Sequence, residues 1–336
     1  MAAGRTGGRV PLHKRVRAGV FLICITGLYL LFFVLFGETA RTPGPYTYEL
    51  MQRDLAALKK KYPDTLQMEV VGRSRQNRAI YAARAGDFEA DRHVLIQAGI
   101  HGREYMTTLL AMRQLQRLLE RGVPEGTLVH ILPMTNPDGV TISQKGEATP
   151  WLTAVYERDV YFNHTELPLK QYLRAWKANA AGVDINRNFD AQWHRIDGTV
   201  DAPSFAYYRG TAPESEPETR ALVEYAKKYP FQATISYHAT GSEIYYDFGD
   251  NDAVNHVGYQ LACAVALATG YEIVPDDGTS FGGFKDWAIE KLSIPSLTIE
   301  IGKRRTPLPG YEFFSIWNKN KDVPYIVIDF IKHSNK

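Results

Sequence analysis

The chain contains 336 residues, of which 45% are hydrophobic and 12% are aromatic. This composition is sufficient to bury a full core, and it excludes a disordered or low-complexity protein. The formal net charge is +2, but residues 1–17 contain five basic and no acidic residues, which leaves a charge of −3 on residues 18–336. The main body of the chain is therefore not basic, and we expect no nucleic-acid partner.

The first predicted element is an uncharged stretch of 20 residues at 18–37, about the length that a helix needs to cross a bilayer. We expect an uncleaved transmembrane anchor, because this stretch is long for a signal peptide and the sequence that follows it is a poor cleavage site. A cleaved signal peptide is the alternative. The positive-inside rule places the basic tail at 1–17 in the cytoplasm and the residues after the span outside it. Pro43, Gly44 and Pro45 resist helix and strand and predict a linker at 38–45, followed by an extracytoplasmic domain at 46–336. The lipid bilayer is thus an expected partner, and the cell membrane is the expected location.

Beyond residue 46, hydrophobic periodicity predicts alternating strands and helices. In chain order we expect a helix at 48–62, strands at 66–71 and 79–83 around a turn at 72–74, a strand at 93–100, a helix at 106–119, a strand at 128–132, a turn at 136–139, a helix from a capping box at 215–218 to residue 228, a strand at 233–237, helices at 255–268 and 284–292, a strand at 296–301 and a helix at 323–332. This order predicts an α/β protein: a three-layer α/β/α sandwich with a mixed, mostly buried central sheet, preceded by one transmembrane helix. Functional side chains gather at strand ends in such folds.

Three candidate metal ligands follow predicted strands. His101 and Glu104 lie three positions apart after the strand at 93–100, and His238 follows the strand at 233–237. A catalytic zinc site uses three such protein ligands and leaves one position for water, so we predict one zinc ion per chain. The alternatives are structural: His101 could cap a helix, Glu104 could stabilise the helix N-terminus, and His238 could be a hydrogen-bonded core residue.

Glu300 is the one carboxylate in an otherwise apolar strand at 296–301. A buried carboxylate must be paired, ligated or active in proton transfer. Beside a metal-activated water, Glu300 would act as general base and then pass the proton to the leaving amine. The alternative is an ion pair with a lysine or arginine.

Asn186 and Arg187 follow Asp184 in the segment 182–189. A guanidinium binds a carboxylate through two parallel hydrogen bonds, and a neighbouring amide adds a neutral donor. We therefore predict that Asn186 and Arg187 bind an anionic group of the substrate. The alternative for Arg187 is a structural salt bridge with Asp184.

Taken together, these residues resemble the zinc carboxypeptidases of the carboxypeptidase A type, family M14. The resemblance extends over residues 46–332 and rests on ordered motifs: Gly72-Arg73-Ser74, His101-x-x-Glu104, Asn136-Pro137-Asp138-Gly139, Gly182-Val183-Asp184-Ile185-Asn186-Arg187-Asn188-Phe189, His238 after a strand, and Thr298-Ile299-Glu300. It implies a carboxypeptidase A-like fold and a zinc metallopeptidase. The family's zinc ligands correspond to His101, Glu104 and His238. The family's general base corresponds to Glu300. The family residues that bind the terminal carboxylate of a peptide substrate correspond to Asn186 and Arg187.

Within the family, the chain resembles bacterial γ-D-glutamyl-L-diamino-acid peptidases, which cleave the stem peptides of cell-wall murein. The resembling segments are Trp176-Lys177-Ala178-Asn179, Ser215-Glu216-Pro217-Glu218-Thr219 and Gly282-Gly283-Phe284-Lys285-Asp286-Trp287. This resemblance implies hydrolysis of the γ-D-glutamyl-diaminopimelate bond, and the predicted anchor would place the domain where murein lies. Two alternatives stay open: a carboxypeptidase of ordinary peptides, and a non-catalytic module that binds wall peptides. The intact ligand set and Glu300 argue against the second.

Two positions depart from the family pattern. Digestive members have an arginine after a tryptophan that polarises the scissile carbonyl, whereas Lys177 follows Trp176 here; Lys177 or Arg174 could replace that arginine. Those members also have a tyrosine that closes over the substrate, where this chain has residues 278–281 without a tyrosine, and Tyr271 is the nearest one upstream.

Lys285 lies where the family reads the side chain of the departing residue. A cation at this position would favour an acidic group on that residue, and the extra carboxylate of meso-diaminopimelate is such a group. The alternative is a solvated helix lysine without a role in binding.

Overall fold

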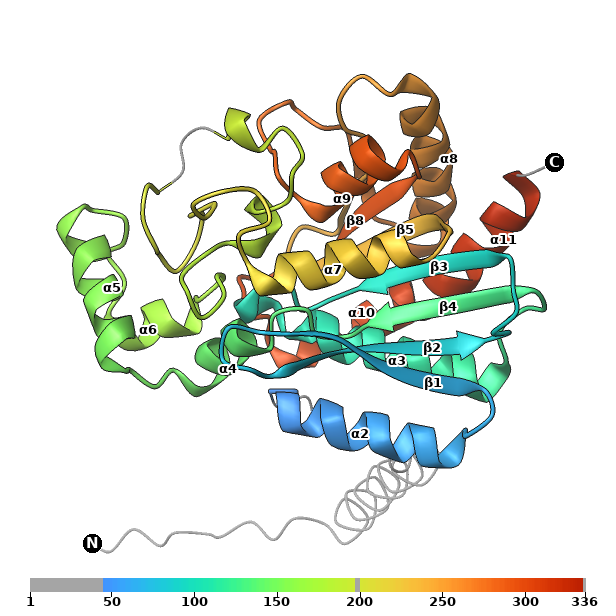
Figure 1. The fold of residues 1–336 in the computed structure, drawn as a ribbon, viewed down its shortest axis with the longest axis horizontal. Coiled ribbons are helices and arrows are strands. Elements are labelled where there is room, and N and C mark those ends of the chain that lie inside the picture. The colour runs from blue at the N-terminus through green and yellow to red at the C-terminus, as the bar shows by residue number, and fades with distance from the viewer. Residues whose placement is uncertain (1–44, 197–199, 335–336) are drawn as a thin grey trace, which may run out of the picture. The chain divides into compact units, whose positions relative to one another are not determined.

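The central sheet of the protein, seen in a computed structural model, is mixed and has eight strands among the residues that the structure describes, which are 45–196 and 200–334. The strand order is β1-β2-β4-β3-β5-β8-β6-β7, and Figure 1 labels β1 to β5 and β8. β3 is parallel to both β4 and β5, and β5 is parallel to β8, whereas β2 and β6 pair antiparallel with their neighbours β4 and β8. The strands are β1 (Leu66–Arg73), β2 (Ala79–Gly86), β3 (Arg92–Gln97), β4 (Thr127–Leu132), β5 (Phe231–His238), β6 (Glu243–Tyr245), β7 (Glu272–Val274) and β8 (Ser296–Glu300).

Helices cover both faces of this sheet. Along β3, Val94 and Ile96 enter one core cluster and Leu95 enters the other, because successive side chains of a strand point to opposite faces. The first cluster includes residues of α2 (Tyr48–Lys61), α3 (Met106–Arg121), α8 (Asp252–Thr269), α10 (Phe313–Asn320) and α11 (Val323–Ser334); the second includes residues of α7 (Pro217–Lys228) and α9 (Phe284–Trp287). The predicted α/β fold with a mixed central sheet is confirmed.

Two predicted local structures are wrong. Residues 136–139 do not form an isolated turn but begin helix α4 (Pro137–Lys145), because Asn136 Oδ1 accepts the backbone N–H of Gly139 and proline occupies the first helical turn. The capping box at 215–218 is also absent. α7 has Glu216 as N-cap without a side-chain hydrogen bond, and Glu218 instead accepts the backbone N–H of Arg75.

A segment that the sequence pattern did not predict lies beside the sheet. It contains α5 (Pro150–Tyr161) and α6 (Leu169–Arg174) (Figure 1). Side chains of these two helices share a small core of their own with Trp176. The buried carboxylate of Asp159 accepts hydrogen bonds from the hydroxyls of Tyr172 and Ser204, and thereby ties α5 to α6 and to the following loop. This segment leads directly to Lys177.

The predicted tail at 1–17, the predicted span at 18–37 and residues 38–44 of the predicted linker lie outside the described residues. Within the described part of the chain, no helix combines the length and the apolar character that a membrane span requires.

Candidate metal centre and active site

Three buried side chains meet where β3 and β5 end. His101 follows β3, Glu104 lies in the short 3-10 helix η1 (Gly102–Glu104), and His238 is the last residue of β5. One ligand atom from each lies within 4.8 Å of the others, and the three residues are at most 3% exposed. The structure thus brings together all three predicted metal ligands.

The turn between His101 and Glu104 depends on Gly102. A Cβ at this position would lie 2.4 Å from the carbonyl oxygen of Gly139 in α4, so no side chain fits. The backbone N–H of Gly102 donates to the carbonyl of Lys177 at 3.0 Å. Close packing against α4 and the Lys177 segment therefore fixes the spacing of the two ligands.

Hydrogen-bond geometry orients the ligands toward a common centre. His101 Nδ1 lies 2.9 Å from Glu104 Oε1 and 3.1 Å from His238 Nδ1, while His101 Nε2 lies 3.1 Å from Asp184 Oδ1. A proton on Nε2, donated to Asp184, leaves the Nδ1 lone pair of His101 free to bind a metal. Burial alone would raise the pKa of Glu104, but His101 and His238 outweigh it and lower that pKa, which keeps the carboxylate ionised. Two imidazole nitrogens and one carboxylate are a donor set that suits zinc.

Asp184 is a functional residue that the sequence interpretation missed, since it was considered only as a partner of Arg187. Its carboxylate is fully buried, and besides His101 it contacts Lys177 Nζ at 3.0 Å, with Arg187 Nε farther away at 3.9 Å. Burial would raise the pKa of Asp184, but Lys177 and His101 hold it well below its usual range. Asp184 therefore links the metal centre to two cations.

Glu300 is the last residue of β8 and pairs in register with His238 on one side and Glu243 on the other. Its Oε2 atom is buried without a hydrogen-bond partner, and within residues 45–196 and 200–334 its carboxylate forms no ion pair. Burial raises its pKa to about 8; the charge of His238 lowers the value and that of Glu104 raises it. The alternative of a structural ion pair with lysine or arginine is not seen among these residues. The carboxylate has the free oxygen and the high proton affinity that a general base requires.

Asn186 and Arg187 form the short 3-10 helix η2 (Ile185–Arg187) with donors available. Asn186 Oδ1 accepts the N–H of Phe284 at 3.0 Å, which leaves the side-chain NH2 group to donate. Arg187 Nε has no hydrogen-bond partner in the described structure, and the guanidinium lies 5.5 Å from the ring centroid of Tyr207. The alternative salt bridge from Arg187 to Asp184 is present only at the long distance of 3.9 Å.

The two candidate replacements for the family's carbonyl-polarising arginine lie in different environments. Lys177 is partly buried and contacts Asp184, whereas Arg174 is exposed and lies beside Gly146 at the end of α4. Of these two cations, only Lys177 is joined to the metal centre by the contacts of Asp184.

Lys285 is 8% exposed and is therefore not a solvated helix lysine. Its ammonium contacts Asp286 Oδ1 at 2.7 Å and donates to the carbonyl of Asp247. Since an ammonium has three donors, these two contacts leave one for another acceptor.

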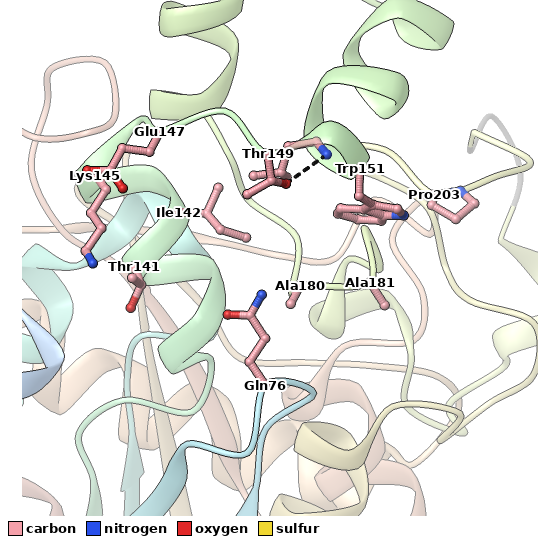
Figure 2. A pocket seen from close by; sticks show the side chains of 11 residues that line it. Gln76, Thr141, Ile142, Lys145, Glu147, Thr149, Trp151, Ala180, Ala181 and Pro203 are labelled. Atoms are coloured by element: carbon pink, nitrogen blue, oxygen red, sulfur yellow. Dashed lines mark hydrogen bonds between the residues drawn. The ribbon is translucent and has the colours of Figure 1, made fainter.

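A cavity of about 520 Å³ lies between α4 and α5 and is separate from this site. Figure 2 shows Trp151 beside Ala180 and Ala181, which line it. None of the predicted site residues contributes to its wall. Trp151 packs against Trp176 with 6.1 Å between ring centroids, so one wall of the cavity supports the segment that carries Lys177.

Comparison with known proteins agrees with the geometry of the site. Residues 51–322 match the zinc carboxypeptidase family Peptidase_M14. The γ-D-glutamyl-L-diamino acid endopeptidase 1 of Lysinibacillus sphaericus is 28% identical over 82% of this chain and 70% of its own length. Among solved structures, bovine thrombin-activatable fibrinolysis inhibitor aligns with a TM-score of 0.68 at 17% identity, over 87% of this chain and 98% of its own. Murein-tripeptide amidase from Escherichia coli O157 aligns with a TM-score of 0.50 at 22% identity, over 79% of this chain and 92% of its own.

At these identities the two solved structures establish a shared fold. The family match covers most of the chain, and one buried cluster within it could hold a metal ion. The family predicted from sequence is confirmed: the chain belongs to the zinc carboxypeptidases of family M14 and is a zinc metallopeptidase.

Proposed function

We propose that the protein hydrolyses the amide bond next to the carboxyl terminus of a peptide, namely the γ-D-glutamyl-diaminopimelate bond of murein stem peptides. The observation that carries the peptidase reaction is the unpaired, buried Oε2 of Glu300 beside the His101, Glu104 and His238 cluster. The murein substrate is supported by similarity to a γ-D-glutamyl-L-diamino acid endopeptidase and by the shared fold of a murein-tripeptide amidase.

His101, Glu104 and His238 would hold the zinc ion. Zinc, when bound, supplies a Lewis acid that increases the acidity of water and polarises a carbonyl. Glu300 would take a proton from the attacking water and deliver it to the amine of the departing residue, which its raised pKa favours. Asp184 would keep His101 in the tautomer that binds metal.

The cations around Asp184 would position the substrate. Arg187 and the free amide of Asn186 would bind the terminal carboxylate, because a guanidinium and an amide supply several directed donors. Lys177 would stabilise negative charge that develops on the scissile carbonyl oxygen. The third N–H of the Lys285 ammonium would donate to the extra carboxylate of diaminopimelate, although Asp286 already neutralises part of the charge of Lys285.

The cellular setting belongs to the same proposal. The uncharged stretch at 18–37 would anchor the chain in the membrane, with residues 1–17 in the cytoplasm and the peptidase domain on the outer side. Murein stem peptides are present on that side, so the topology agrees with the substrate.

The test uses the full chain, purified in detergent, with L-Ala-γ-D-Glu-meso-diaminopimelate and with an α-linked tripeptide that ends in a free carboxylate. We expect release of diaminopimelate from the first peptide only, loss of the activity with a chelator and recovery with zinc. Cleavage of the α-linked peptide alone would support an ordinary carboxypeptidase instead. Stoichiometric zinc without cleavage of either peptide would support a non-catalytic binding module.

A further inference from the structure

Tyr207 lies against two of the cations that the proposed function assigns to the substrate. Its ring centroid is 5.0 Å from Lys177 Nζ and 5.5 Å from Arg187 Cζ, and both distances are within the range of cation–π contacts. The side chain is nevertheless 43% exposed. One aromatic ring therefore contacts both cations and still presents part of its surface to an incoming ligand.

The backbone around Tyr207 is held by Asp184. The N–H of Tyr207 donates to Asp184 Oδ2 at 3.3 Å, and the carbonyl of Tyr208 accepts the N–H of Asp184 at 2.7 Å. Tyr207 has a φ of +69°, a left-handed conformation that is strained for a bulky residue and is retained where the surroundings impose it. The carboxylate that orients His101 thus also places Tyr207.

Two other tyrosines, Tyr271 and Tyr245, have hydroxyls that already form hydrogen bonds. Tyr271 is buried in the core, where its hydroxyl accepts a hydrogen bond from an asparagine side chain. Tyr245 donates its hydroxyl to Glu243 at 2.8 Å. The hydroxyl of Tyr207, by contrast, forms no hydrogen bond with any residue in the described ranges 45–196 and 200–334. It is therefore free to donate to a bound ligand.

We propose that Tyr207 is a substrate-binding residue of this chain and supplies the tyrosine hydroxyl that residues 278–281 lack. This inference rests on the proposed function, because it requires a substrate with a free terminal carboxylate at Arg187. The ring of Tyr207 holds Lys177 and Arg187 in position, and its hydroxyl donates a hydrogen bond to the carboxylate that Arg187 binds. The contribution is to substrate binding, and no proton transfer or covalent step is assigned to Tyr207.

The test compares wild type with Tyr207→Phe and Tyr207→Leu in the full chain. Tyr161→Phe is the matched control, because Tyr161 is a 78% exposed tyrosine on α5 whose ring packs against Phe162. We measure kcat and KM with both carboxylate-terminated peptides named above and with their carboxyl-terminal amides, together with zinc content and melting temperature.

Removal of the hydroxyl in Tyr207→Phe should raise KM for carboxylate-terminated peptides about 10-fold, the effect of one hydrogen bond to a charged group, with kcat nearly unchanged. Tyr207→Leu should raise KM by roughly a further 3-fold through loss of the cation–π contacts. Amidated peptides should not distinguish Tyr207→Phe from wild type, because they lack the carboxylate that accepts from the hydroxyl, and the control should match wild type throughout.

A KM for Tyr207→Phe equal to that of wild type would overturn the assignment, as would an equal loss on amidated peptides. If Tyr207→Leu fails to fold, Tyr207→Phe alone decides. Failure of the wild-type chain to cleave any peptide would overturn the proposed function and this inference with it, whereas an active wild type with unchanged Tyr207 variants would overturn only the latter.

Discussion

Two pairs of buried histidines, one that includes the start of strand β3 and one beyond its end, differ in how their nitrogens are used. At its start, His93 Nδ1 contacts His130 Nε2 at 3.0 Å, His93 Nε2 contacts the carbonyl of Ala90, and His130 Nδ1 contacts the Tyr225 hydroxyl. All four ring nitrogens are therefore paired. After its end, His101 and His238 both lie beside Glu104, and His238 Nε2 is buried without a hydrogen-bond partner in the described structure.

This contrast teaches that the partners, and not the burial, separate a structural histidine pair from a metal centre. A neutral chain of donors from Tyr225 through His130 and His93 to a carbonyl uses every proton and every lone pair. His101 lies between two carboxylates. When its Nε2 proton is donated to Asp184, the Nδ1 atom of His101 and the nearby carboxylate oxygen of Glu104 both keep a lone pair that can bind a metal. Within the described residues, the cluster of His101, Glu104 and His238 is the group that could hold a metal ion.

The largest expected effect is the loss of zinc binding when one histidine of the predicted metal centre is replaced. His238→Asn should abolish zinc binding at stoichiometric concentration and reduce activity to background, because a catalytic zinc needs three protein ligands. The matched variant His130→Asn should retain one zinc per chain. Zinc content by atomic absorption decides the matter, and equal zinc in both variants would contradict the assignment.

Glu300→Gln should lower kcat/KM by about 10²- to 10⁴-fold, which is the usual contribution of general acid–base catalysis. Zinc content should stay that of wild type, because Glu300 is not among the ligands. Glu69→Gln is the control, because Glu69 lies on the edge strand β1, outside the site, where it forms an ion pair with Lys228 of α7. Glu300 would lose its assigned role if the variant cleaved the murein peptide at the wild-type rate.

Asp184→Asn should weaken zinc binding by about 10- to 100-fold, the usual cost of losing a carboxylate that orients a ligating histidine. Competition with a chromophoric chelator measures this affinity. Asp159→Asn changes an equally buried carboxylate outside the site and should leave zinc affinity unaltered. Similar zinc affinities for the two variants would show that Asp184 does not act on His101.

The smallest expected effect concerns stability at the other end of β3. Burial, then the charges of His93 and Arg84, lower the pKa of His130 to about 2. Below the ordinary histidine pKa of about 6.5, the unfolded chain therefore binds a proton that the native chain does not. Stability should fall as the pH decreases, by about 2 kcal/mol at pH 5 for this group.

Urea unfolding at pH 7 and pH 5 measures this loss. His130→Asn should reduce the pH dependence, whereas His256→Asn, at an exposed position on α8, should preserve it. An unchanged pH dependence in His130→Asn would show that the pair near Ala90 does not disfavour protonation.

The clustering of His101, Glu104 and His238 was predictable because these residues follow strands whose apolar pattern is clear, and because the ends of parallel strands meet at one edge of a sheet. Asp184 and Tyr207 were not predictable from such a pattern. Asp184 reaches His101 across 83 positions, and Tyr207 owes its place to a left-handed backbone. Contacts of this kind depend on loop conformation, which periodicity does not specify.

In the fold, too, features with a clear sequence pattern were predicted and features without one were not. Long periodic elements such as α3 and β5 were predicted within a few residues. The strands β6 and β7 were missed, because a strand of three residues is too short to show an alternating pattern. Asn136 and Pro137 suit both a turn and a helix start, and the packing of α4 against η1 favours the helix.

The most direct test of the central claim is a zinc-edge anomalous difference map from crystals of the zinc-loaded protein. We predict one strong peak, about 2.0–2.2 Å from the nearest atoms of His101, Glu104 and His238, with Asp184 outside the coordination sphere. A peak at His93 and His130, or no peak at the carboxyl ends of β3 and β5 in zinc-loaded crystals, would contradict the account.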